Sequence, residues 1–153
     1  MTEDKATFDA LARIEKCSDP ADLKRIYANA SKLGNEIVAE AAQRKRFAVM
    51  PAAEPGTFEH DVWQSIYALE AALSDERGKT IRLARTRQKI ARDGELVTVR
   101  DLIMKPAASE GYHMLIERGW PELAFESVAL RHPDKFAVEV LEKATARLSI
   151  QSK

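Results

Sequence analysis

The residues with the most evident chemical potential lie between Gly78 and Gly94, in the stretch GKTIRLARTRQKIARDG, which holds six Lys and Arg side chains and one acid. Three interpretations compete: a phosphate-binding loop, a helix that contacts nucleic acid, and a solvated helix face. The first rests on Gly78, Lys79 and Thr80, which match the end of the loop pattern in which two glycines let backbone N–H groups wrap phosphates. The pattern's first glycine would be residue 73, which is Leu73, and an amphipathic helix rather than a strand precedes the stretch. The phosphate-loop interpretation is therefore rejected.

The same stretch has the periodicity of an amphipathic helix from Thr80 to Asp93. At about 100° per residue, its apolar residues face one side and most of its cations the other. The apolar side is formed by Leu83, Ala84, Ile90 and Ala91, and the charged side by Arg82, Arg85, Lys89 and Arg92. Such a stripe, about 15 Å long, matches a row of backbone phosphates. With two flanking cations included, the predicted nucleic-acid-binding residues are Arg77, Lys79, Arg82, Arg85, Lys89 and Arg92.

This charged face is also compatible with two roles that involve no nucleic acid. The outer face of an amphipathic helix is commonly just solvated, and acids of residues 1–75 could pair with the cations. The second role is contact with a protein partner that has an acidic surface. The positive charge is local, because residues 76–106 carry nine basic and four acidic side chains, whereas residues 1–75 carry nine basic and 13 acidic ones. Arg87 is a separate case: it projects on the apolar side, so we expect it to form a structural ion pair.

No catalytic or metal-binding constellation is evident elsewhere in the sequence. His60, His113 and His132 lack a suitably spaced ligand partner, so we expect them to have polar surface or capping roles. Cys17 lies between Glu15 and Asp19, where a thiolate is disfavoured. We therefore predict that the chain is not an enzyme and binds no cofactor and no metal.

The elements that must position these residues are all predicted to be helices. The sequence predicts an all-α fold, a compact single domain over residues 1–153 with about eight to nine helices built from helical hairpins. We expect a helical hairpin over 20–50, a linker over 51–56, a long helix plus the basic helix over 57–94, and further helices over 95–148.

Capping residues mark where these helices begin. Side chains suited to the N-cap position occur at Asp19, Asn35, Thr57, Thr98 and Ser109. A further helix is predicted from Pro121 to Arg131, after a turn that follows the Ser109 helix. These last two helices superficially resemble a DNA-reading helix-turn-helix, but the second carries Glu122 and Glu126, so we assign the pair to packing.

Composition and the N-terminal sequence indicate the cellular location. With 45% apolar and 31% charged residues, the chain has the composition of an ordinary soluble protein. The first residues, Met1 to Lys5, lack the basic start and apolar run of a secretory signal, and no stretch approaches the length of a membrane span. The single cysteine, Cys17, cannot form an internal disulfide. We expect a cytoplasmic protein that does not contact membranes.

Three short segments carry a resemblance to known proteins. The segments ANASKLG at 28–34, GKTIRLARTRQKIARDG at 78–94 and MLIERGWPEL at 114–123 resemble a small family of all-helical bacterial proteins to which no activity is attached. The similarity extends from about Asp22 to Leu148. It implies a helical domain and no catalytic residue or cofactor.

These observations lead to two hypotheses of function. The first is a non-enzymatic nucleic-acid-associated protein that contacts phosphates through the basic helix face. The alternative is a protein-interaction adaptor or inhibitor module with no nucleic-acid contact, for which the hairpin over 20–50, with Tyr27 and the cluster Arg44, Lys45 and Arg46, is the cue. The oligomeric state does not follow from the sequence.

Overall fold

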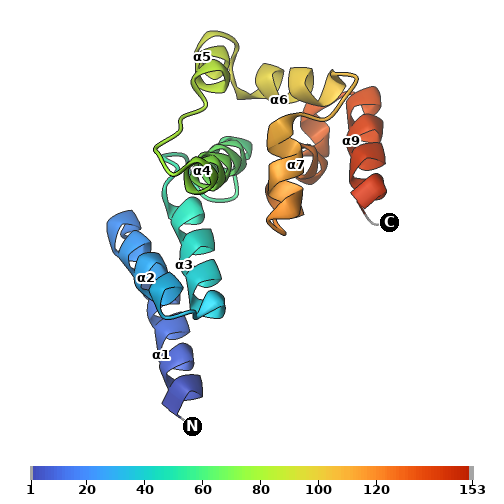
Figure 1. Ribbon diagram of the computed structural model, residues 1–153. Coiled ribbons are helices and arrows are strands. Elements are labelled where there is room, and N and C mark those ends of the chain that lie inside the picture. The colour runs from blue at the N-terminus through green and yellow to red at the C-terminus, as the bar shows by residue number, and fades with distance from the viewer. Residues whose placement is uncertain (1, 152–153) are drawn as a thin grey trace. The chain divides into compact units, whose positions relative to one another are not determined.

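The computed structural model describes residues 2–151 of the chain. Within this range the chain forms nine α-helices, two short 3-10 helices and no strand, so the predicted all-α fold with eight to nine helices is confirmed (Figure 1). The chain divides into two compact units, residues 1–52 and residues 53–153. The division falls within the segment 51–56, which has the composition of a linker. The single-domain organisation stays a prediction.

The first unit consists of α1 (Thr2–Lys16), α2 (Pro20–Lys32) and α3 (Glu36–Val49). Asp19 begins α2 by accepting a hydrogen bond from the backbone N–H of Ala21, and Asn35 begins α3 in the same way through Val38 N–H. Gly34, with φ of 74°, makes the turn between them. The small buried core comprises Ile14, Leu23, Ala30, Val38, Ala39 and Ala42. Its alanines allow close approach of α2 and α3.

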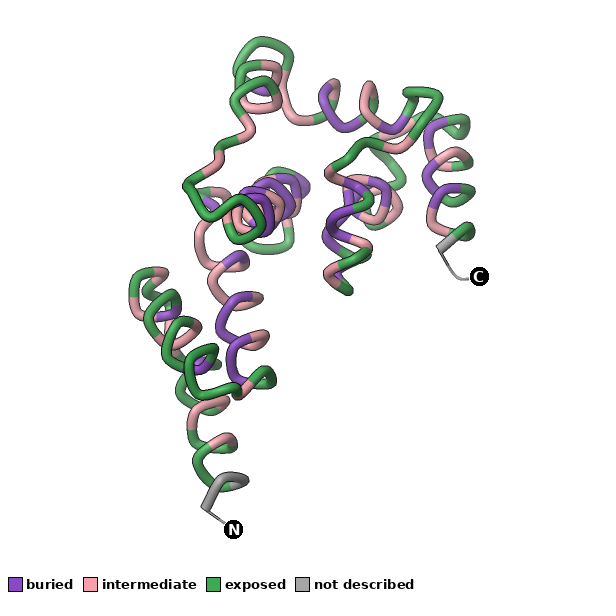
Figure 2. The backbone as a smooth tube through the Cα atoms, in the orientation of Figure 1, coloured by how far each residue is buried: buried purple, intermediate pink, exposed green. Residues whose placement is uncertain are grey.

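The second unit is built around a long central helix. Its elements are α4 (Phe58–Arg77), α5 (Ala84–Asp93), α6 (Glu95–Met104), α7 (Glu110–Glu117), η1 (Pro121–Leu123), α8 (Phe125–Arg131), η2 (Pro133–Lys135) and α9 (Val138–Gln151). The core of this unit includes Phe58, Val62, Ile66, Ile90, Val99, Ile103, Val128, Ala129, Val140 and Ala144. Figure 2 shows that α4 is buried over much of its length, whereas α5 is largely exposed.

The predicted basic helix from Thr80 to Asp93 is wrong at its start, because α5 begins only at Ala84. Residues 79–83, which we call the strap, run between Gly78 and α5 without helical structure. Gly78 ends α4 in the left-handed conformation, at φ of 67°. The strap's N–H groups at Ile81 and Leu83 then bond to side chains of α4 instead of to helical carbonyls. Tertiary hydrogen bonds have replaced the first turn of the predicted helix.

Two other predicted helix boundaries need correction. Thr98 does not cap a helix, because α6 already begins at Glu95 and the buried Thr98 hydroxyl donates to Gly94 O at 2.8 Å. The helix predicted from Pro121 to Arg131 is broken into η1 and α8 by Ala124, whose backbone is extended. On a continuous helix Leu123 and Val128 would lie about 140° apart. The break allows both to be buried.

Candidate binding groove

The six predicted cations lie on three different parts of the second unit. Arg77 is the last residue of α4, Lys79 and Arg82 lie in the strap, and Arg85, Lys89 and Arg92 lie on α5. Because Arg82 is outside the helix, the continuous four-cation stripe does not form.

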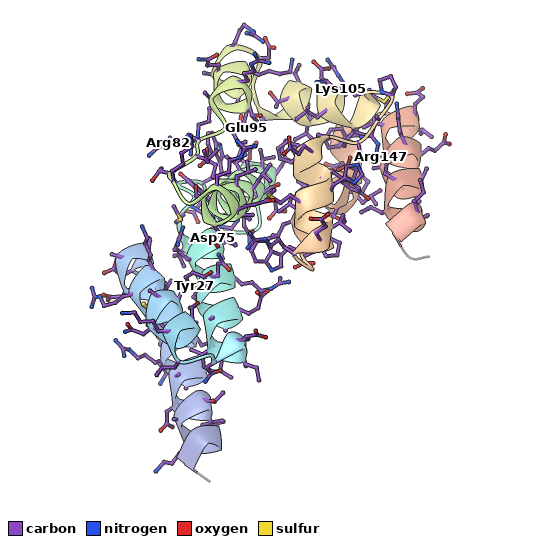
Figure 3. The ribbon with its side chains drawn as sticks, in the orientation of Figure 1. Tyr27, Asp75, Arg82, Glu95, Lys105 and Arg147 are labelled. Atoms are coloured by element: carbon purple, nitrogen blue, oxygen red, sulfur yellow. The ribbon has the colours of Figure 1, made fainter. Side chains whose placement is uncertain are left out.

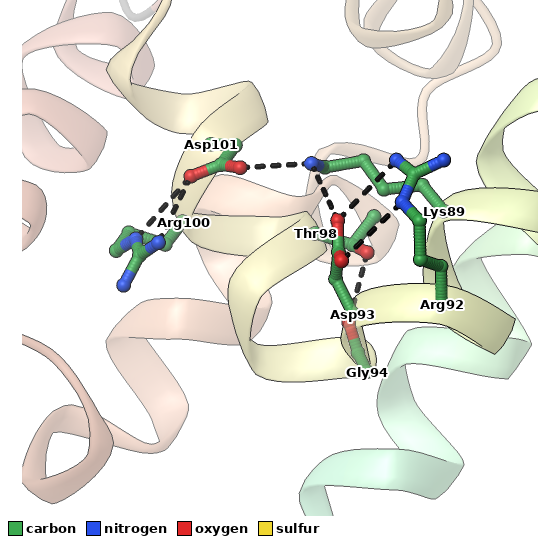
Figure 4. Close-up of polar contacts among 7 residues, drawn as sticks. All are labelled: Lys89, Arg92, Asp93, Gly94, Thr98, Arg100 and Asp101. Carbon is green, nitrogen blue, oxygen red and sulfur yellow. Dashed lines mark hydrogen bonds and ion pairs between the residues drawn. The ribbon is translucent and has the colours of Figure 1, made fainter.

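Lys89 and Arg92 are paired with neighbouring carboxylates, as Figure 4 shows. Lys89 Nζ lies 2.8 Å from Asp101 Oδ2 and 3.2 Å from Asp93 Oδ2, and Arg92 Nη2 lies 3.3 Å from Asp93 Oδ2. The hydrogen bonds that Lys89 donates to Asp101 and Asp93 raise the pKa of Lys89, and the same bond from Lys89 lowers the pKa of Asp101. Arg92 and Lys89 likewise lower the pKa of Asp93. These acids belong to α5 and α6, not to residues 1–75 as the sequence suggested.

The other four predicted cations are less engaged. Arg77 is paired with Glu110 at 3.6 Å, and both side chains are at least half exposed. The side chains of Lys79, Arg82 and Arg85 are exposed and make no hydrogen bond or ion pair with any residue that the structure describes. The free positive charge of the stretch is thus concentrated in the strap and at the start of α5.

Arg87 forms the structural ion pair that its position on the apolar side predicts. Its Nε and Nη2 donate to the two carboxylate oxygens of Glu70, each at 2.7 Å. Its guanidinium carbon also lies 5.3 Å from the ring centre of Trp63 and 5.7 Å from that of Tyr67. The hydrogen bond with Glu70 raises the pKa of Arg87. We call this arrangement of Glu70 and Arg87 the clasp.

The clasp also holds the strap against α4. The Glu70 carboxylate accepts a third hydrogen bond, at Oε2 from Leu83 N–H at 2.9 Å. One turn further along α4, Ser74 Oγ accepts from Ile81 N–H at 2.8 Å. Two side chains of one helix therefore anchor alternate residues of the strap, and this leaves Arg82 between them on the exposed side.

A hollow of about 640 Å³ lies beside the strap, and we call it the α4–α7 groove. Its volume is within the range of small-ligand and side-chain binding pockets. Apolar side chains from α4, the strap, α7 and α8 line it, among them Ile66, Leu69, Leu73, Ile81, Leu83, Leu115 and Phe125. Charged residues at the groove are Arg77, Arg82, Arg85 and Lys105, with Glu110 and Glu126 from α7 and α8. Figure 3 shows Arg82 on the strap and Lys105 at the end of α6. Four cations and two acids therefore surround a surface that is partly aliphatic and partly polar.

A buried ion pair braces the far wall of the groove. Arg147 of α9 donates to Glu126 Oε2 at 2.9 Å, and both side chains are less than a tenth exposed. Arg147 also donates to the backbone carbonyls of Leu102 and Lys105, while Tyr112 Oη donates to Arg147 O. Figure 3 shows Arg147 between α7 and α9. This network connects α6, α7, α8 and α9, so the wall is held by a satisfied set of buried polar groups.

The histidines do not all occupy the surface positions predicted for them. His113 is exposed, but His60 is buried at 5% exposure, because the first turn of α4 packs into the core. His132 Nε2 lies 2.8 Å from Asp61 Oδ2, and Arg131 Nε lies 3.5 Å from the same oxygen. Sequence reasoning missed this pair, since its members are 71 residues apart and no local spacing indicates it. Among the described residues no group of three or more His, Cys, Asp or Glu side chains has the geometry of a metal site.

Comparison with known proteins adds no function to this geometry. No protein-family model matches the chain, and neither a curated protein nor a solved structure matches it. None of the described helices has the length and apolar character needed to cross a membrane.

Proposed function

We propose that the chain is a non-enzymatic binding protein whose α4–α7 groove takes an acidic, partly apolar segment of a partner protein. The observation that supports the proposal is the position of Arg82 and Arg85, whose side chains are exposed and unpaired among the described residues and also line a partly aliphatic hollow. The cations attract the carboxylates of an acidic segment, and burial of its apolar side chains on the groove floor contributes further binding free energy.

The groove favours a protein segment over a nucleic acid. The charged phosphates of a nucleic acid make no favourable contact with an aliphatic floor. Binding to single strands commonly uses exposed aromatic faces on which bases stack. Of the two aromatic residues at the groove, Tyr112 is 5% exposed with its hydroxyl bonded to Arg147 O, and Phe125 is half-buried and packs against the core of the second unit. Two members of the predicted phosphate-binding stripe, Lys89 and Arg92, are already paired with Asp93 and Asp101.

Nucleic-acid binding remains a second candidate because Lys79, Arg82 and Arg85 are free of partners in the described part of the chain. With Arg77 included, about four phosphates would be neutralised, and log affinity would fall with log salt at a slope of about −3.6 on duplex DNA. Releasing Lys89 and Arg92 by Asp93→Asn with Asp101→Asn would steepen that slope by up to about 1.8.

Fluorescence anisotropy with labelled probes tests both candidates. The probes are an unstructured peptide of Glu, Leu and Ser, its counterpart with Lys in place of Glu, and single-stranded and duplex oligonucleotides. We expect the acidic peptide to bind, the basic peptide not to bind, and Arg82→Glu with Arg85→Glu to abolish binding. Arg13→Glu with Lys24→Glu is the matched control, since it makes the same charge change at exposed residues of the first unit.

The alternative results are equally clear. Nucleic acid would be favoured if the oligonucleotides bind, the peptides do not, and the slope of log affinity against log salt is steeper in the Asp93→Asn, Asp101→Asn variant. Failure of every probe at low ionic strength would reject both candidates.

A further inference from the structure

We infer that the occupant of the α4–α7 groove is a single amphipathic α-helix with its carboxylates along one flank of its apolar stripe. The inference rests on the proposed function and specifies the partner's conformation and charge pattern. Three features of the groove carry it: the state of its backbone groups, the one-sided distribution of its charges, and the shape of its floor.

Most backbone groups of the strap from Ile81 to Leu83 are already bonded, which argues against an extended occupant over this part of the strap. The strap is the non-helical wall segment that runs along α4, and the N–H groups of Ile81 and Leu83 donate to Ser74 and Glu70. The Arg82 and Leu83 carbonyls accept from Ala84 and Arg87 N–H groups. An extended peptide on this surface would leave its own amides unpaired over aliphatic side chains, whereas a helix satisfies its backbone internally.

The charges at the groove differ between its two sides. Three of the four cations, Arg77, Arg82 and Arg85, come from the end of α4, the strap and the start of α5. Both acids, Glu110 and Glu126, come from α7 and α8, and the fourth cation, Lys105, follows the end of α6. Figure 1 shows the strap and α7 on opposite sides of α4. A helix with acids on both flanks would place some of them against Glu110, and like charges at close range select against such an arrangement. The pattern therefore favours a helix whose carboxylates are concentrated on the strap side, where three of the four cations lie.

The exposed Arg77–Glu110 pair can yield to such a ligand. Its 3.6 Å separation and the exposure of both side chains make it a weak pair. A carboxylate from the occupant can replace Glu110 on Arg77, so all three cations of this side are available to one flank of the helix.

The floor accepts apolar side chains at helical spacing. Leu69 and Leu73 lie one turn apart on α4, and Ile81 and Leu83 of the strap extend the aliphatic surface. An occupant with apolar residues at i, i+4 and i+7 presents anchors over about 10 Å, which suits a hollow of about 640 Å³.

Three labelled peptides of identical composition test the inference by anisotropy with the full chain. Peptide A has a Leu stripe at helical spacing, Glu on one flank and Lys on the other. Peptide B keeps the stripe but mixes Glu and Lys on both flanks. Peptide C scrambles the order and has no stripe. Circular dichroism matches the helicity of A and B.

We expect peptide A to bind about tenfold more tightly than B and C, because B loses two to three favourable charge pairs. Arg82→Glu with Arg85→Glu should abolish binding of A, and Arg13→Glu with Lys24→Glu should not. Gly111→Ala alters the floor without changing charge, since the added Cβ would lie 2.5 Å from Leu69 Cδ2 and that side chain must shift. It should weaken A, and Ile81→Ser provides a second floor variant.

The outcomes separate this inference from the proposed function. If peptides A and B bind equally and neither binds the Arg82→Glu, Arg85→Glu variant, the one-sided flank of carboxylates is overturned. The proposal that the groove binds an acidic segment would still stand. Binding of C as tight as that of A would overturn the helical occupant only. Absence of binding by all three peptides and by the unstructured acidic peptide would reject the inference together with the proposed function.

Discussion

Replacing Arg87 by alanine should destabilise the second unit because it dismantles the clasp. Arg87 supplies two of the three hydrogen bonds that Glu70 accepts, and it covers the faces of Trp63 and Tyr67. The Glu70 side chain is only 11% exposed, so in the variant a carboxylate would remain in a largely dry site with Leu83 N–H as its partner. An unpaired buried charge is among the more costly defects in a folded protein.

The expected loss is about 3 kcal/mol in the free energy of unfolding. Removing one partner of a fully buried ion pair costs about 3 to 5 kcal/mol. The Arg87 side chain is 26% exposed, so water partly screens the pair and places the effect at the lower end of that range. The two cation–π contacts are included in this figure and each contributes up to about 1 kcal/mol.

Urea unfolding followed by tryptophan fluorescence measures the effect in the right part of the molecule. Both tryptophans, Trp63 and Trp120, belong to residues 53–153, so the signal reports the second unit alone. Glu70→Gln is the matched variant: it keeps an acceptor for Leu83 N–H and leaves Arg87 able to reach water. We expect it to cost about 1 to 2 kcal/mol.

A double-mutant cycle decides whether the two residues act as a pair. Glu70→Gln combined with Arg87→Ala should be less destabilising than the sum of the two single changes, because no uncompensated charge remains. An Arg87→Ala variant within about 0.5 kcal/mol of the wild type, or strictly additive effects, would refute the reasoning.

Three further predictions concern other parts of the chain. Arg147→Met should cost about 3 to 5 kcal/mol, since it leaves Glu126 buried without its partner, and urea unfolding followed by tryptophan fluorescence measures it. The Lys89 ammonium lowers the pKa of Asp101, so this pair stabilises the fold above about pH 3.9 and the stabilisation is lost as the pH falls through the lowered value. The difference in urea midpoint between the wild type and Asp101→Asn should therefore shrink below about pH 4. A difference that stays the same at low pH would contradict a stabilising role of the Lys89–Asp101 pair. Asp19→Ala removes the cap of α2 and should cost about 1 kcal/mol, measured by far-UV circular dichroism during unfolding.

Helix starts were largely predictable because capping acts within three residues. The side chains of Asp19, Asn35, Thr57 and Ser109 each accept a backbone hydrogen bond at the start of a helix, as their residue types and positions indicate. The ion pair of Arg87 was predictable for a similar reason, since a cation on the apolar side of a helix requires a partner. Its identity was not, because Glu70 lies 17 residues away on another helix.

The start of α5 could not be predicted from periodicity. The apolar and charged pattern from Thr80 onward is typical of a helix, but the strap's N–H groups are bonded by Ser74 and Glu70. These tertiary hydrogen bonds form in place of the hydrogen bonds of the first helical turn. Arg82 therefore lies outside the helix.

The amino-acid sequence alone determined the features that depend on residues a few positions apart. These are the helical character of the chain, most of its helix starts and the basic character of residues 76–106. Which of those cations are free depends on contacts between helices. Asp101 on α6 binds Lys89, the clasp places Arg82 on the exposed strap, and α4, α7 and α8 enclose the groove. Charge–charge attraction weakens with distance and is screened by salt, so the function of a basic face is decided by which acids and apolar side chains the fold brings beside it.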